Sequence, residues 1–478
     1  MRMSTPTGYN ARQTIRMETV TPEPKARGLI IAPILAVVLF LLLLANAQPP
    51  ALAITAGVAL WCAIWWVLET VPIAVTSLVP IALFPLLGVL SPKAVAGAYG
   101  SPIILLLLGG FIVSAAMQHS GAHKQVALAM LRVIGTHSKR RLILGFMLAS
   151  ATLSMWISNT ATTVMLLPVA MAVLEGSRDR QLGVALLLGI AYAASIGGIA
   201  TPVGTPPNLI FMQVYAENTG REIDFVQWMG LGLPVVALFL PLCAWWLSRR
   251  LRGASGIVPP QRPGWRPAES RVLWVLGITA LLWITRKPPL LGWSTLPGLT
   301  HANDAAVALL AAISVFVIPD GAGGRLLNWQ RAARIPWGVL LLFGGGLTLA
   351  KAFDQSGLSA VLGAHLALLS ALPVWLMIAL VCLGVTFLTE MTSNTATTAL
   401  LMPVLAAAAL GANVEPALLM APAAISASCA FMLPVATGPN AVIYAGGNLT
   451  VRDMTRNGLV LNLIGVVVVT AVALWRLT

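Results

Sequence analysis

The chain has 478 residues, of which 58% are apolar and only 9% are charged, and its mean hydropathy is +0.88. A soluble domain has about 25% charged residues and cannot bury so much apolar surface, so the composition excludes that class and indicates helices in a lipid bilayer. The net charge of +14 does not indicate nucleic-acid binding, because the basic residues gather in short loops between apolar segments, where they set membrane topology.

Residues 1–28 are polar and contain arginines, but they lack the cleavage-site pattern of a signal peptide. We interpret them as a cytoplasmic tail. Four apolar segments follow, each long enough for a helix that crosses the hydrocarbon core. They lie at about 29–46, 51–68, 71–90 and 102–118. Four crossings return the chain to the cytoplasm at the basic loop 137–141.

Only one apolar segment separates this loop from the next basic loop, 177–180, although both are expected in the cytoplasm. A re-entrant hairpin resolves the conflict, because it enters and leaves the membrane on the same side. Its centre is predicted at Ser154–Thr163. A turn at that depth must be packed in protein or line a wet cavity.

The same rules apply to the rest of the chain. They predict spans at about 183–212 and 228–247, a cytoplasmic linker at 248–268, spans at 271–285, 304–319 and 338–354, a second hairpin at 374–407, and spans at 415–447 and 457–475. The prediction is an all-α polytopic protein of the inner (cytoplasmic) membrane, with about eleven transmembrane helices and two re-entrant hairpins. Its N-terminus lies inside and its C-terminus outside. Arg286 and Lys287 are exceptions to the positive-inside rule, because this topology places them outside.

Six residues, Ser158–Thr163, recur letter for letter as Ser393–Thr398. Gly109-Gly110 and Ser120-Gly121 likewise match Gly345-Gly346 and Ser356-Gly357. The predicted topology gives the two halves opposite orientations, so we expect an inverted repeat. This architecture is typical of secondary transporters, whose substrate lies at the repeat interface near the midplane.

Two further apolar spans are interrupted at corresponding places, by 204–208 (Gly-Thr-Pro-Pro-Asn) and by 436–440 (Ala-Thr-Gly-Pro-Asn). Glycine and proline break the helical hydrogen-bond ladder and expose backbone carbonyls and amides. Four broken elements are therefore expected to converge, two hairpin tips and two unwound helices.

Such a site suits an anion and a cation together. Helices resume after each Ser-Asn-Thr, so their first amides and the helix dipole favour anionic groups. Backbone carbonyls on the other side of each break are hard oxygen ligands that suit Na⁺. No Lys or Arg lies near either motif, so a bound dianion needs co-bound cations to balance its charge. Glu390 is the only acid near a hairpin tip, and it either carries a proton or accepts hydrogen bonds from hairpin amides.

At these residues the chain resembles the divalent anion:sodium symporter family, the carriers of succinate, citrate and related carboxylates. The resemblance rests on Ser158-Asn159-Thr160, on 389–395 (Thr-Glu-Met-Thr-Ser-Asn-Thr) and on the two Pro-Asn breaks, and it covers most of residues 29–478. It implies a homodimer with the elevator fold of the ion-transporter superfamily. The scaffold would comprise 29–135 and 269–370, and the moving transport domain 136–247, with the first hairpin, and 371–478, with the second.

The resemblance also implies the roles of individual residues. Those expected to contact the substrate are Ser158, Asn159, Ser393, Asn394 and Thr437, and Thr205 is expected to line the same cavity. One Na⁺ site is expected from Ser154, Ser158, Asn159 and Gly204, and another from Thr389, Thr392, Asn394 and Ala436. Gly438 stands where members of this family often have proline, a departure that could alter substrate preference.

The predicted function is secondary active transport of a C4-type dicarboxylate, such as succinate, malate or fumarate, together with Na⁺ as the co-transported ion. A sodium-independent dicarboxylate exchanger, or a carrier of citrate or sulfate, stays open as an alternative of the same fold. An anion channel would need a continuous polar pore, whereas the sequence shows isolated breaks. An enzyme is not expected, since the spans contain no Ser/His, paired-Asp or His-Glu-x-x-His arrangement, and the four cysteines fit no metal-site spacing.

Overall fold

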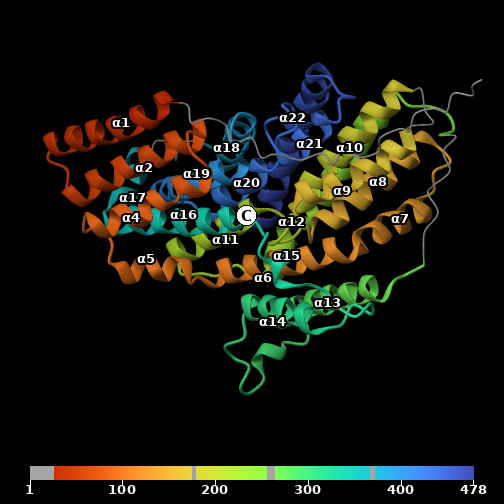
Figure 1. Ribbon diagram of the computed structural model, residues 1–478. Coiled ribbons are helices and arrows are strands. Elements are labelled where there is room, and N and C mark those ends of the chain that lie inside the picture. The colour runs from red at the N-terminus through yellow and green to blue at the C-terminus, as the bar shows by residue number, and fades with distance from the viewer. Residues whose placement is uncertain (1–25, 175–178, 256–263, 367–371) are drawn as a thin grey trace, which may run out of the picture.

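The structure is a computed structural model that describes residues 26–174, 179–255, 264–366 and 372–478 (Figure 1). The predicted tail, up to residue 25, and part of the predicted linker, 256–263, lie outside the described residues. Within the described ranges every regular element is helical. There, 9 helices are long and apolar enough to cross a membrane, and shorter apolar helices accompany them. The prediction of an all-α polytopic membrane protein is confirmed.

The first part of the chain contains six helices. They are α1 (Ala26–Ala45), α2 (Pro50–Leu68), α3 (Ile73–Thr76), α4 (Leu78–Leu86), α5 (Pro92–Tyr99) and α6 (Pro102–Ser120). The prediction of a single helix at 71–90 is wrong, because the segment divides at Ser77 and ends at Leu86. Pro80 has no N–H to donate to the carbonyl of Thr76, so the helical ladder is weakened there.

Two connecting helices were not predicted. Gly121 (φ 82°) ends α6 and starts α7 (Ala122–Ile134), in a stretch expected to be loop. Its counterpart α17 (Leu358–Leu366) follows Gly357 (φ 78°). Both glycines adopt the left-handed conformation that other residues disfavour, which redirects the chain between two helices. Each connecting helix leads into one hairpin.

Both predicted hairpins form as helix–turn–helix units. The first is α8 (Lys139–Ser154) with α9 (Asn159–Leu174), and the second is α18 (Val374–Thr389) with α19 (Asn394–Gly411). Each Asn of the repeated Ser-Asn-Thr motif is the first residue of the returning helix. The motif therefore occupies the hairpin tip in both halves, as predicted.

The two interrupted spans are also broken as predicted. The first consists of α10 (Arg180–Gly198) and α11 (Pro206–Thr219), the second of α20 (Ala417–Ala427) and α21 (Gly438–Ala445). Each is followed by one long helix, α12 (Phe225–Ser248) or α22 (Val451–Leu477).

Contacts at the two ends show that the broken helices run in opposite directions. Arg180, at the start of α10, pairs at 2.8 Å with Asp453, in the first turn of α22, which follows α21 after a short loop. Tyr215, near the end of α11, donates to Glu415, just before α20, at 2.7 Å. The start of one broken helix thus lies beside the end of the other, as an inverted repeat requires.

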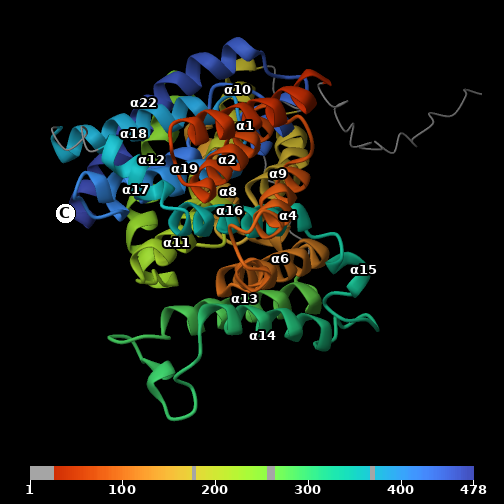
Figure 2. The same ribbon diagram turned by 90° about the vertical axis from the view of Figure 1, so that its left-hand side faces the viewer.

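The middle of the chain contributes α13 (Pro267–Ile284), a 3-10 turn (Trp293–Thr295), α14 (Asp304–Val317), α15 (Trp329–Ala332) and α16 (Trp337–Gln355). Figures 1 and 2 show α13 and α14 side by side at one edge of the molecule, next to α6. A Cβ on Gly109 of α6 would lie 2.7 Å from the backbone of Ala308 in α14. This glycine lets the two helices approach closely.

Basic residues of the loops expected in the cytoplasm gather at one end of the molecule. Lys139 at the start of α8 pairs with Asp179 at 2.6 Å, and Arg140 donates to the carbonyl of Leu251 beyond the end of α12. Near the end of α6, Arg266 donates to the carbonyl of Ser120. The loops expected in the cytoplasm therefore share one face.

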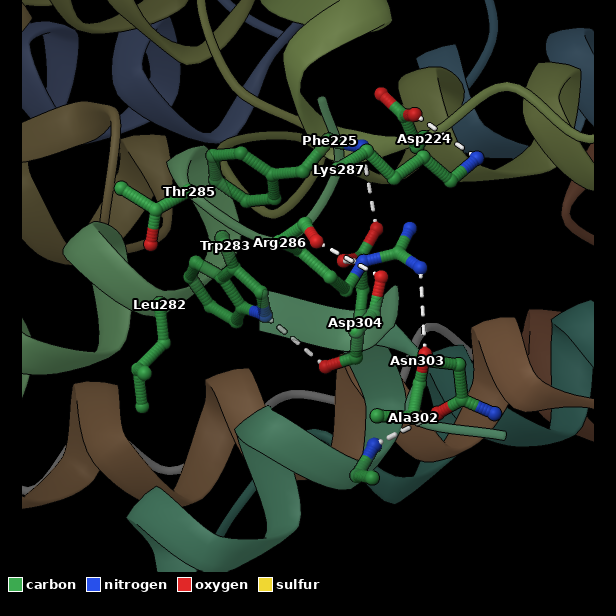
Figure 3. A network of polar contacts seen from close by, with 12 residues as sticks. Asp224, Phe225, Leu282, Trp283, Thr285, Arg286, Lys287, Ala302, Asn303 and Asp304 are labelled. Atoms are coloured by element: carbon green, nitrogen blue, oxygen red, sulfur yellow. Dashed lines mark hydrogen bonds and ion pairs between the residues drawn. The ribbon is translucent and has the colours of Figure 1, made fainter. Parts of the chain in front are cut away.

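The exceptions, Arg286 and Lys287, lie at the opposite end of α12. Arg286 is 2.7 Å from Asp304 and Lys287 is 3.1 Å from Asp224 (Figure 3). Each cation faces a carboxylate, so neither adds net positive charge to that end.

Candidate functional site

The tip of the first hairpin is fixed onto the break between α10 and α11. Ser154 Oγ donates to Asn159 Oδ1 at 2.6 Å, across the turn. Thr201, in the break, donates to the carbonyl of Met155 at 2.5 Å. A Cβ on Gly198 would lie 2.4 Å from Asn159 Oδ1, so only glycine allows the end of α10 to approach the tip so closely.

The tip of the second hairpin is fixed onto the break between α20 and α21. Thr389 Oγ1 donates to the carbonyl of Ala427 at 3.1 Å. The Glu390 carboxylate accepts the backbone N–H groups of Met432 and Leu433, both at 2.9 Å, and the Asn462 amide at 2.7 Å. Glu390 thus bonds amides of the break rather than of the hairpin, and it holds these two elements together.

One asparagine braces each break in the same way. Asn208 Nδ2 donates to the carbonyls of the residues ten and seven positions earlier, Gly198 and Thr201, at 3.0 and 2.8 Å. Asn440 Nδ2 does the same at the same two spacings, to Ala430 and Leu433, at 3.1 and 3.0 Å. Both side chains are fully buried, and both Oδ1 atoms have no hydrogen-bond donor among the described residues. The equal spacing shows that the two breaks are equivalent structures.

The two halves interlock around one cavity. Helix α9 of the first hairpin packs against α21 of the second break, and α19 of the second hairpin packs against α11 of the first break. Between them lies a cavity of about 330 Å³. Of the six predicted substrate residues, five line it, namely Ser158, Asn159, Thr205, Asn394 and Thr437. Ser393 is half-buried at the second tip and does not line the cavity.

Several residues that line the cavity were not predicted. Thr160 and Thr395 are the third residues of the two Ser-Asn-Thr motifs. The repeated motif could therefore have predicted that they line the cavity. Ser114 and Trp156 also line the cavity, from α6 and from the first hairpin turn. Neither belongs to a repeated motif, although Trp156 lies within the predicted hairpin centre, Ser154–Thr163.

Gly438 has a steric role in the cavity wall. A Cβ at this position would lie 2.0 Å from Thr160 Oγ1, so the glycine allows the start of α21 to contact the first hairpin tip. Gly438, which stands where family members often have proline, therefore lies at a point where the two halves of the chain approach closely. Replacing Gly438 would push Thr160 away from its present place in the wall.

None of the cavity-lining residues is ionisable. The polar groups that it offers are hydroxyls, amides and the backbone at four helix ends. The first free N–H groups of helices α9, α11, α19 and α21 favour negative charge, and Thr437 Oγ1 already caps α21 by accepting from Asn440 N at 3.3 Å. The cavity is therefore uncharged, with neutral polar groups set among apolar side chains such as Leu107, Phe111 and Val339.

Of the eight residues expected to bind cations, four line the cavity, namely Ser158, Asn159, Gly204 and Asn394. The other four, Ser154, Thr389, Thr392 and Ala436, are buried and do not line it. In the first group, the bond from Ser154 to Asn159 brings two of the expected oxygen ligands together. In the second group, Thr392 Oγ1 contacts Thr397 Oγ1 at 2.6 Å, and Asn394 Oδ1 accepts from Thr395. The side chains of the second group thus form hydrogen bonds with neighbouring residues and not with each other. In the described residues no group of three or more His, Cys, Asp or Glu side chains could hold a metal ion.

The inverted repeat and the uncharged cavity between its halves define a membrane transporter. More specifically, the chain belongs to the citrate transporter family, whose sequence profile matches residues 63–421. This family consists of carriers, so the protein is a transporter and not an enzyme, and the resemblance to the divalent anion:sodium symporters is confirmed.

Two curated relatives span nearly the whole chain. It is 37% identical to the sodium-dependent dicarboxylate transporter SdcS of Staphylococcus saprophyticus, over 93% of this chain and 90% of the relative. It is 38% identical to the protein of the same name from Staphylococcus aureus, over 94% of this chain and 91% of the relative.

Two solved structures share the fold at low sequence identity. Neisseria gonorrhoeae MtrF, described among antimetabolite efflux pumps, matches with a TM-score of 0.58 at 14% identity, covering 82% of this chain and 83% of MtrF. The Alcanivorax borkumensis YdaH transporter matches with a TM-score of 0.53 at 15% identity, covering 79% of this chain and 86% of YdaH. At this level of identity the likeness concerns the fold alone.

Proposed function

We propose that the protein carries a C4-type dicarboxylate across the membrane together with Na⁺. The observation that carries the proposal is the uncharged cavity in which two Ser-Asn-Thr tips and two helix breaks meet. A dianion there is held by hydroxyls, amides and helix N-termini, and no Lys or Arg neutralises it. Co-bound Na⁺ supplies the missing positive charge. The names of the SdcS relatives support the same cargo and the same coupling ion.

The carboxylate contacts are assigned to Ser158, Asn159, Asn394 and Thr437, with Thr205 on the cavity wall and Ser393 at the second tip. Na⁺ is assigned to two groups of residues, each made of cavity-lining residues and buried residues next to them. The first comprises Ser154, Ser158, Asn159 and Gly204, and the second Thr389, Thr392, Asn394 and Ala436. Na⁺ prefers hard oxygen ligands, which both groups contain. Binding in the second group requires Asn394 Oδ1 to leave Thr395.

Transport proceeds by an elevator motion in this proposal. The moving part comprises 136–247 and 371–478, and the scaffold comprises 29–135 and 269–370. Two observations support this division. Tyr192 in α10 donates to the carbonyl of Phe431 at 2.6 Å, which joins the two halves of the moving part. The cavity lies between the parts, because Phe111 and Val339 of the scaffold line it opposite the hairpin tips.

The basic face is assigned to the cytoplasm, which places the N-terminus inside and the C-terminus outside an inner membrane. Ser114 and Pro336, on the cytoplasmic halves of their segments, line the cavity, and this supports an inward-facing state. The ion pairs of Arg286 and Lys287 lie on the outer side in this orientation. A homodimer is proposed from the family resemblance.

Radiolabelled succinate uptake into proteoliposomes tests the coupling. An inward Na⁺ gradient is compared with an equal K⁺ gradient, in vesicles that are empty or preloaded with unlabelled dicarboxylate. We expect sodium-dependent uptake into empty vesicles. Uptake that needs preloading and ignores sodium would overturn the symport proposal in favour of an exchanger. Citrate and sulfate, tested as competitors, define the range of anions that the cavity accepts.

A further inference from the structure

A second cavity lies on the basic face, away from the transport cavity. Its volume is about 420 Å³, and it is formed where α10 and α22 begin and α12 ends. Its lining differs in character from that of the transport cavity, because guanidinium groups dominate it. The ionisable residues of the lining are Arg180, Arg249, Arg250, Arg456 and Asp453.

The positive charges in this cavity exceed its negative charge. Asp453 pairs with Arg180 at 2.8 Å, which compensates one guanidinium. Among the described residues, no carboxylate lies within ion-pair distance of Arg249, Arg250 or Arg456. Burial, followed by the positive charges of Arg250 and Arg456, lowers the pKa of the Arg249 guanidinium. Three like charges thus face one another without an anion, an arrangement that a bound anion would relieve.

The wall of this cavity is held in place before any ligand binds. Arg140 donates to the carbonyls of Arg249 and Leu251, at 3.2 and 3.1 Å, and so fixes the turn after α12. The Arg249 guanidinium stacks over the Trp246 ring, 3.2 Å from its centroid. A guanidinium fork that is fixed in this way loses little entropy when it binds an anion.

The surroundings favour a ligand at the membrane surface. Trp245, next to Trp246, is 61% exposed at the end of the apolar helix α12. Tryptophan at the end of a membrane helix is typical of the headgroup level of a bilayer. Basic pockets between helices at that level on the cytoplasmic side suit the headgroups of anionic lipids.

We propose that this cavity binds a phosphate-bearing anion, either the headgroup of an anionic phospholipid or free phosphate. Arginine forks match the oxygens of phosphate groups in bidentate geometry, and more than one guanidinium can share a single phosphate. The proposal is independent of the transported substrate. A lack of transport would leave it standing, and it can fail while transport is intact.

The thermal unfolding midpoint of the full-length protein in detergent tests the proposal. Soluble dihexanoyl phosphatidylglycerol, dihexanoyl phosphatidylcholine, inorganic phosphate and succinate are titrated separately at constant ionic strength. We expect a saturable rise of the midpoint with the anionic lipid, with phosphate or with both, and no rise with phosphatidylcholine. The Arg250→Gln/Arg456→Gln double variant should bind the active ligand at least about tenfold more weakly, because two charge-assisted contacts are lost.

The matched control is the Arg334→Gln/Arg452→Gln double variant, which also loses two positive charges. Both arginines are exposed and neither lines the cavity. This control should respond like the wild type. A rise with the lipid but not with phosphate identifies a headgroup site, and the reverse identifies a phosphate site. The proposal is overturned if neither ligand shifts the midpoint, if both double variants respond alike, or if only succinate produces a shift that Arg250→Gln/Arg456→Gln removes.

Discussion

Arg286 Nε lies 2.7 Å from Asp304 Oδ1, and Asp304 Oδ2 accepts the backbone N–H of Phe225 at 3.1 Å. One carboxylate at the start of α14 therefore binds both the end of α13 and the first residue of α12 (Figure 3). Since α12 belongs to the proposed moving part and α13 and α14 to the scaffold, this contact joins the two parts. The proposed elevator motion requires this contact to open.

Removing Arg286 tests the strength of this contact. Both side chains of the pair are only 11% exposed, so Arg286→Ala leaves Asp304 buried without its cation, and we expect a loss of about 3 kcal/mol of stability. Lys287→Gln is the control, because Lys287 is 46% exposed and its pair is worth less than about 1 kcal/mol. Thermal unfolding of both variants is the measurement. Equal midpoints would show that the buried pair contributes no more than the exposed one.

The two tip asparagines are predicted to be essential for transport. Asn159→Ala removes an amide from the cavity wall and the acceptor of the Ser154 bond, and Asn394→Ala removes the equivalent amide. We expect uptake to be abolished in each, with the protein still folded. Asn46→Ala, an exposed asparagine at the end of α1, serves as control and should retain uptake. Wild-type uptake in both tip variants would refute the site.

Thr437→Val separates substrate binding from sodium binding. The hydroxyl lines the cavity and caps α21, so its loss should raise the substrate KM by about tenfold. The sodium concentration for half-maximal uptake should change less. Thr437→Ser keeps the hydroxyl and should restore the substrate KM. An unchanged KM in Thr437→Val would contradict the assigned contact.

Gly438 and Thr160 are predicted to be coupled. Gly438→Ala introduces a methyl group 2.0 Å from Thr160 Oγ1, so we expect a marked loss of uptake. Adding Thr160→Ala removes that hydroxyl and should recover part of the loss, beyond the sum of the two single effects. Strictly additive effects in this double-mutant cycle would argue against the contact.

Glu390 is predicted to act as a structural acceptor rather than a proton carrier. Glu390→Gln places an amide N–H₂ among groups that already donate, so we expect about 1–3 kcal/mol of destabilisation. The uptake that remains should keep the wild-type dependence on pH. A pH profile that flattens in the variant would instead indicate proton transfer by Glu390.

The sequence predicted the elements that break the apolar pattern. Repeated motifs located both hairpin tips and both helix breaks, because polar residues, Gly and Pro stand out against apolar helices. It missed α7 and α17, since both segments are too short to be recognised as membrane spans. It also missed the partners of Glu390, because Met432 and Asn462 lie far from it in the chain and contribute backbone or buried amide groups. Packing between the two halves, such as that of Gly438 against Thr160, could not be predicted from the sequence because it depends on the tertiary structure.

The neutrality of the transport cavity has an electrical consequence. With no ionisable side chain in the lining, the empty site contributes no charge of its own to the membrane field. The lining therefore adds no voltage dependence to either step, and the response of the loaded step to voltage should differ from that of the empty carrier only through the net charge of the cargo. Current per transported dianion then equals the number of Na⁺ ions minus two. A recording of current alongside uptake would count the coupled ions directly.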